Sequence, residues 1–154
     1  MELSVKQYAA IGRTAVACSR IEYLIRYFAA HCVGSPEFDI ANSAIDDRQP
    51  REAFEKVIRA VSLEYPALQT RVRAVKTILG EAKDLADKRN VLMHGIVEVD
   101  PKTRKPTIYA RKGSLSCDQR ELDDVAVEAT DFYDRFCDVC GALFEDLAEA
   151  RAKR

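Results

Sequence analysis

The feature that most constrains the fold of this chain is an apolar stripe at helical spacing that stops at Gly95. Apolar side chains three and four residues apart lie on one face of an α-helix, and here they are Leu68, Val72, Val75, Leu79, Ala82 and Ala86. A glycine directly after such a pattern is typical of the left-handed residue that ends a helix. The pattern therefore predicts a long helix from about Pro66 to His94.

Beyond Gly95 the pattern changes to that of extended strands. Residues 96–99 and 107–111 are rich in β-branched and aromatic side chains, and the polar segment between them contains Pro101 and Pro106. These features predict a β-hairpin immediately after the long helix.

Two more helices are expected before this one. Apolar residues at helical spacing predict a first helix over about 4–32 and a second from Pro50 to about Tyr65, where the following proline disfavours helix. The stretch from Gly34 to Pro50 has no clear period and is expected to form a loop with at most one short turn.

The last helix has the most regular apolar pattern in the chain. Ser116 and Gln119 fit a capping box at its start, and the heptad that follows consists of Leu122, Val125, Ala129, Phe132, Phe136, Val139, Leu143 and Leu147. The sequence thus predicts a mainly all-α fold. We expect a helical bundle of four to five helices, with a small β-hairpin after the helix that ends at His94.

Length and composition indicate a single domain over residues 1–154. The chain is 47% hydrophobic and 32% charged, and no stretch rich in Pro, Gly and Ser divides it. Four of its five cysteines fall on helical patterns and are expected to be small core residues in a reducing compartment; they are Cys18, Cys32, Cys137 and Cys140. Charges interrupt the apolar runs near the N-terminus, so we expect a cytoplasmic protein without a signal peptide or membrane span.

Three polar residues lie at the end of the long helical pattern. Arg89 falls on its buried side, while Asn90 and His94 are four residues apart and share a face on which they can hydrogen-bond. Arg89 and His94 diverge by about 140° around the helix axis. The plain interpretation is a paired arginine at the core edge and a histidine that caps the helix end.

Glu22 falls between Cys18 and Ile25 on the apolar stripe of the first helix. A carboxylate in apolar surroundings is costly unless it is paired, so we expect Glu22 to meet Arg89. The alternative is an ordinary pair between Glu22 and Arg26, four residues on, at a solvated helix edge.

The predicted hairpin is the most basic segment of the chain. Tyr109 is interleaved with five cations, namely Lys102, Arg104, Lys105, Arg111 and Lys112. The net charge of −1 gives the whole chain no pull toward nucleic acid, so an RNA-binding surface has to be local. We expect these cations to contact RNA phosphates; the alternative is a solvated hairpin tip.

Arg89, Asn90 and His94 spell RNxxxH, which resembles the signature of HEPN domains, small α-helical domains with a similar layout of helices. Many HEPN domains are metal-independent ribonucleases. The resemblance therefore implies an enzyme that uses no metal and no cofactor, with a composite site in a homodimer. Ile96 stands where the nucleotidyltransferase-linked HEPN toxins carry a tyrosine, so the resemblance does not extend to that subgroup.

The residue types suit RNA cleavage in which the ribose 2′-OH attacks the adjacent phosphorus. This reaction needs a group that exchanges a proton near neutral pH, a fixed cation for the phosphoryl oxygens and a group that orients the imidazole. His94, Arg89 and Asn90 are the candidates for these roles in that order, and Glu22 would hold Arg89 or orient the site. Because each chain supplies one such histidine, a two-fold dimer would supply the second proton-transfer group.

Other functions fit the same residues. A non-catalytic HEPN-like module would bind RNA, a nucleotide or a protein partner, and a purely structural helical bundle is a third candidate. As an enzyme, the protein would suit a toxin or antiviral-defence role, with an antitoxin or another regulatory protein as a further partner. Replacing His94 distinguishes these candidates. If RNA cleavage is lost while RNA binding remains, the protein is an enzyme and not only a binding module.

Overall fold

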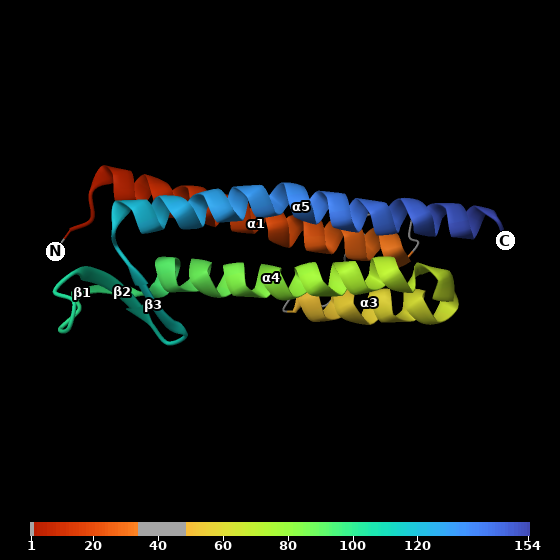
Figure 1. The fold of residues 1–154 in the computed structure, drawn as a ribbon, viewed down its shortest axis with the longest axis horizontal. Helices are drawn as coiled ribbons and strands as arrows, with labels where there is room; N and C mark the ends of the chain where they lie inside the picture. Colours follow the sequence, from red (N-terminus) through yellow and green to blue (C-terminus); the bar gives the residue numbers. More distant parts are fainter. Residues whose placement is uncertain (1, 34–48) are drawn as a thin grey trace. The chain divides into compact units, whose positions relative to one another are not determined.

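The structure of the protein is a computed structural model that describes residues 2–33 and 49–154. Its elements in chain order are α1 (Val5–Val33), α3 (Pro50–Glu64), the 3₁₀ turn η1 (Pro66–Leu68), α4 (Gln69–His94), β1 (Ile96–Val99), β2 (Pro106–Ala110), β3 (Gly113–Ser116) and α5 (Gln119–Ala152) (Figure 1). The predicted mainly helical fold, with a small sheet after α4, is confirmed. Residues 34–48 of the expected loop lie outside the described residues.

The described chain forms two compact units, and α1, α4 and α5 contribute residues to both. One unit, here called the motif unit, comprises Met1–Arg20 and Ala82–Tyr133; the other, the helical unit, comprises Ile21–Glu81 and Asp134–Arg154. The expectation of a single domain over residues 1–154 stays a prediction. No helix within the described ranges has the length and apolarity needed to cross a membrane.

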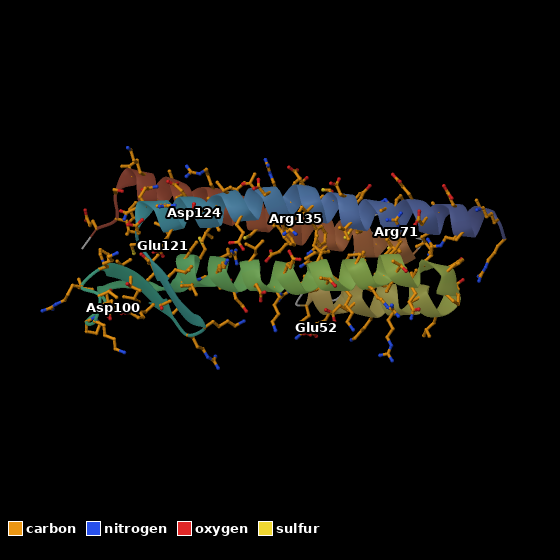
Figure 2. The ribbon with its side chains drawn as sticks, in the orientation of Figure 1. Glu52, Arg71, Asp100, Glu121, Asp124 and Arg135 are labelled. Atoms are coloured by element: carbon orange, nitrogen blue, oxygen red, sulfur yellow. The ribbon has the colours of Figure 1, made fainter. Side chains whose placement is uncertain are left out.

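In the helical unit, α3 runs alongside the first half of α4 (Figure 1). The buried face of α3 consists of Phe54, Ile58 and Val61. Ion pairs at the helix edges join Arg71 to Asp146 and Arg135 to Glu81, each at 2.7 Å, and both arginines are labelled in Figure 2. Exposed pairs of this kind contribute at most about 1 kcal/mol, so the buried apolar side chains dominate the stability of this unit.

In the motif unit, the three strands form an antiparallel sheet in the order β1-β2-β3. Figure 1 shows this sheet at the C-terminal end of α4, with β3 leading into α5. Val97, Ile108 and Leu115 are partners across the strands, and Ile108 is only 2% exposed. These three pack in one core cluster with residues of α1, α4 and α5, namely Ala10, Val91, Leu92, Leu122 and Val125.

The third strand was not predicted. β3 pairs with β2 over Gly113–Ser116 and extends the expected hairpin. Its sequence, GSLS, has a single apolar residue, Leu115, which is too little to produce the alternating pattern of a strand.

α4 ends at the predicted place, but for a different reason than expected. Gly95 does not have a positive φ, so it is not the left-handed cap that we predicted. Its N–H donates to the carbonyl oxygen of Val91 at 2.9 Å. A Cβ at this position would overlap the Ile108 side chain and would lie 2.5 Å from the Val91 oxygen and 2.9 Å from the Tyr109 oxygen. Glycine is required here because β2 passes directly over the backbone.

The start of α5 also differs from the prediction. Asp118 caps this helix, since its Oδ1 accepts a hydrogen bond from the backbone N–H of Arg120 at 2.9 Å. Ser116 belongs to β3, and its hydroxyl accepts from the N–H of Asp118. The side-chain amide of Gln119 donates a hydrogen bond to Asp123, four residues later in α5. The predicted capping box of Ser116 and Gln119 is therefore wrong.

We expect Gly95→Ala to lower the free energy of unfolding by about 1–3 kcal/mol, because the added methyl overpacks the junction between α4 and β2. Gly80→Ala, in the interior of α4, is the matched control: a Cβ there meets nothing within 4 Å. This control should instead gain about 0.5–1 kcal/mol from helix propensity. Urea unfolding measures both, and an equal effect of the two substitutions would contradict the close approach.

Candidate functional site

The RNxxxH residues occupy the last turns of α4 in the motif unit. Val91 and Leu92 are 4% and 7% exposed and fix this end of the helix in the core. Arg89 and Asn90 are half-buried beside them, and His94 is exposed in the last turn. The core thus holds the helix while the three polar residues lie at its edge and surface.

Arg89 is bound to its neighbour. Its Nη1 donates to Oδ1 of Asn90 at 3.1 Å, so the Asn90 amide contacts the guanidinium. The Nε of Arg89 is buried and has no hydrogen-bond partner, and no ion pair of Arg89 occurs among the described residues. A buried donor without an acceptor costs about 1–3 kcal/mol. Arg89 is therefore paired through Nη1 but not through Nε, and the plain interpretation of a paired core-edge arginine stays open.

Glu22 does not lie on the buried stripe of α1. It is exposed, because the stripe passes through Cys18, Ile21 and Ile25, which are 4%, 3% and 1% exposed. Our reason for expecting a buried partner for this carboxylate was therefore wrong. Glu22 belongs to the helical unit and Arg89 to the motif unit, and their pairing stays a prediction.

The five basic residues of the hairpin region divide between two turns. Lys102, Arg104 and Lys105 are exposed in the turn from β1 to β2, and Arg111 and Lys112 are exposed in the turn from β2 to β3. Because successive turns of an antiparallel sheet lie at opposite ends of the strand they share, the two groups flank β2. They form two basic clusters and not the single patch that the sequence suggested.

The second of these turns is held to the motif helix. Lys112 Nζ lies 2.8 Å from Oδ1 of Asp87, three residues before Asn90 on α4. This exposed ion pair adds little stability, but it shows that the β2–β3 turn lies against the helix that carries the motif. Arg111 is the adjacent exposed cation.

Asp100 organises the first turn, where Figure 2 labels it. Its Oδ1 accepts from the backbone N–H of Lys102 at 2.9 Å and of Thr103 at 2.7 Å, and its Oδ2 accepts from the hydroxyl of Tyr109. The Tyr109 hydrogen bond, with those from the backbone, lowers the pKa of Asp100 to about 2. The same bond raises the pKa of Tyr109. We had not singled out Asp100, although an Asp before a Pro is a common turn signal.

The cysteines are thiols of the core. Cys18, Cys32, Cys117 and Cys140 are buried, and Cys137 is half-buried. Burial raises the pKa of Cys32 to about 11, against the opposing effect of Arg151, and burial also raises that of Cys140. Thiols of this kind are poor nucleophiles at neutral pH. Within the described ranges, no group of three or more His, Cys, Asp or Glu side chains could hold a metal ion.

Two hollows lie in the helical unit. The larger, of about 650 Å³, runs between α3 and α4 and is lined mainly by charged side chains such as Glu52, Lys56, Arg59, Arg73 and Lys76. The smaller, of about 410 Å³, lies between α4 and α5 beside the pair of Arg135 and Glu81. Neither is lined by Arg89, Asn90 or His94.

Comparisons with known proteins add no relative. No protein-family model, curated protein or solved structure matches this chain. The resemblance to HEPN domains therefore stands on the RNxxxH motif of Arg89, Asn90 and His94 and on the layout of the helices.

Proposed function

We propose that the protein is a metal-independent endoribonuclease that cleaves RNA by transphosphorylation at a composite site in a homodimer. The observation that carries this proposal is the half-buried guanidinium of Arg89, which Asn90 holds through Nη1, on the same helix end as the exposed imidazole of His94. A cation and a proton-transfer group at one helix end are residue types suited to stabilising a phosphate in the transition state.

The reaction assigns a step to each residue. One His94 accepts the proton of the ribose 2′-OH, whose oxygen forms a bond to the adjacent phosphorus. Arg89 stabilises the negative charge that builds on the phosphoryl oxygens. The bond to the 5′-oxygen then breaks, and this oxygen takes a proton from an imidazolium on the opposite side. The products are a 2′,3′-cyclic phosphate and a free 5′-OH.

Asn90 takes a different role from the one first expected. Its amide oxygen accepts from Arg89 Nη1, so it is a positioning residue for the guanidinium rather than for the imidazole. Glu22 is exposed on α1 and remains a proposed second positioning residue for Arg89. The acid–base and electrostatic work then comes from side chains alone, which is why we propose that no metal or cofactor takes part.

The dimer follows from the chemistry. In-line displacement is best served by proton-transfer groups on opposite sides of the phosphorus, and each chain supplies a single His94. His94 and its neighbour Met93 are both exposed, Met93 by 46%, so this end of α4 is open to a second copy. A two-fold axis through that end would bring two His94 side chains to one phosphodiester.

A non-catalytic module that binds RNA, a nucleotide or a protein is the second candidate. The two exposed basic clusters that flank β2 favour it, since they would bind phosphates whether or not cleavage follows. As a ribonuclease, the protein would act in the cytoplasm in a toxin or antiviral-defence role, restrained by an antitoxin or another regulatory protein.

Replacing Arg89 or His94 by alanine should abolish cleavage of a fluorescent single-stranded RNA in EDTA, with a loss of at least about 10²-fold for each, because each removes a transition-state contact. His31→Ala is the matched control, since His31 is the other histidine of the chain and contacts the Tyr27 ring in the helical unit. Cleavage that survives either motif substitution, in a folded variant, would refute these roles.

If the site is shared between two chains, mixing wild-type and inactive chains should change the cleavage rate. Adding a large excess of the inactive His94→Ala chain to a fixed amount of wild type should lower the total cleavage rate, because most wild-type chains would then pair with an inactive copy. The same excess of His31→Ala should raise the rate instead. A wild-type rate unaffected by the His94→Ala chain would show that one chain holds the complete site.

A further inference from the structure

We propose that the outer face of the β1-β2-β3 sheet is a stacking platform for the bases of single-stranded RNA, with Tyr109 at its centre. The inference rests on the proposed function in naming RNA as the ligand, and it adds a surface that the RNxxxH motif does not contain. It also states which form of RNA should bind.

The pleat of the sheet defines this outer face. Val97, Ile108 and Leu115 point into the core cluster, and side chains alternate along a strand. The neighbours of these residues in each strand therefore point outward. They form two cross-strand rows, Ile96 with Tyr109 and Ser114, and Glu98 with Thr107 and Ser116.

Tyr109 lies along this face. It pairs with Ile96 at the start of β1, yet its hydroxyl donates to Asp100 beyond the end of β1. Pro106, the partner of Val99, is three residues from Tyr109 along β2, a length of roughly 10 Å. The Asp100 carboxylate follows Val99 and so lies beyond this pair. To span that length, the phenol ring has to extend along the strand instead of standing upright.

The neighbours of Tyr109 leave room for a base. On one side its cross-strand partner is Ser114, a small and exposed residue, and on the other it is Ile96, which is 68% exposed. Toward Asp100, where the ring extends, the next outward row contains Thr107 and Glu98. A base of any sequence can stack on the ring, since every base has a π-face.

The outer face itself carries the exposed carboxylate of Glu98, which acts on Tyr109 together with Asp100, while the cations lie at the two ends of the face. The two basic turns lie at opposite ends of β2, so a strand stacked on Tyr109 would meet cations at both ends. Arg104 has a φ of 59°, a conformation in which glycine is unstrained and other residues are not. A cation is thus placed at a turn position where the backbone alone would favour glycine.

The platform is continuous with the proposed catalytic site. Ile96 follows His94 by two residues, and Tyr109 is the neighbour of Ile96 on the next strand, about 4.8 Å away in the hydrogen-bonding direction. Lys112 holds the adjacent turn to Asp87 on α4. A base stacked on Tyr109 would therefore place the connected backbone near the end of α4.

The chain contains no tryptophan, which allows a direct test. In Tyr109→Trp, the substituted position carries the sole indole, and stacking of a base on it should quench its fluorescence. Titration with a single-stranded DNA oligonucleotide, which lacks the 2′-OH and cannot be cleaved by transphosphorylation, should quench this variant to saturation. Tyr8→Trp, on the exposed face of α1, is the matched control and should not respond.

Two outcomes of this titration would overturn the platform. One is unchanged fluorescence of Tyr109→Trp with every DNA and RNA oligonucleotide, which is also the result expected if the face binds an acidic protein. The other is equal quenching by a duplex of the same sequence, since paired bases cannot stack on a side chain.

Two further substitutions separate stacking from a structural role. Tyr109→Phe keeps the ring and loses the bond to Asp100, and should change the Kd for single-stranded RNA by less than about twofold. Tyr109→Leu removes the ring and should weaken binding about tenfold or more. Equal loss in both variants would mean that Tyr109 acts only by holding the turn, and would overturn the proposal.

The experiments can contradict the stacking platform without contradicting the ribonuclease, and the reverse. Binding that depends on the Tyr109 ring, with no cleavage by wild type, supports the platform and contradicts the enzyme. Cleavage that depends on His94, with no effect of Tyr109→Leu on the Kd, supports the enzyme and contradicts the platform.

Discussion

The close packing of β2 on the backbone at Gly95 is the constraint on which the motif unit depends. Ile108 and the Tyr109 carbonyl fill the space that a side chain at Gly95 would need, and the Gly95 N–H makes the last helical bond to Val91. Together these contacts stop α4 at His94 and start β1 at Ile96. They also set the register in which Ile96 lies opposite Tyr109.

The packing around the junction of α4 and β2 explains how this helix end tolerates Arg89, whose buried Nε has no acceptor. Such a donor costs about 1–3 kcal/mol. Full burial of apolar side chains such as Val91 and Leu92 stabilises by about 1.5–3 kcal/mol each, so the core more than offsets the cost. Asn90 holds the guanidinium through a hydrogen bond from Nη1.

Much of the fold was predictable from the sequence, because apolar periodicity reports helices directly. The pattern ending at Gly95 predicted the end of α4, and Pro50 and Pro66 predicted the bounds of α3. β3 was not predictable, since Leu115 is its one apolar residue. Gly95 was predicted for the wrong reason, because its role comes from a strand that follows it in sequence and passes over it in space.

The site was harder to predict than the fold, since it depends on contacts and not on periods. Sequence spacing placed Arg89 and His94 on α4 correctly, but the bond from Arg89 to Asn90 joins adjacent residues, which helical spacing does not suggest. Glu22 was assigned to the wrong side of α1 because a residue three from one apolar position and four from another can still lie outside the stripe. The basic run divided into two clusters because the third strand places a turn at each end of β2.

The central claim is that the motif of α4 directs the ribose 2′-OH to the phosphorus. The most direct test is cleavage by wild type of two otherwise identical RNAs, one of which carries a single 2′-deoxy nucleotide on the 5′ side of the mapped cleavage position. The account predicts a 2′,3′-cyclic phosphate from the unmodified RNA and no cleavage at the modified position, with unchanged binding. Continued cleavage at that position, with a 3′-OH and a 5′-phosphate as products, would contradict it.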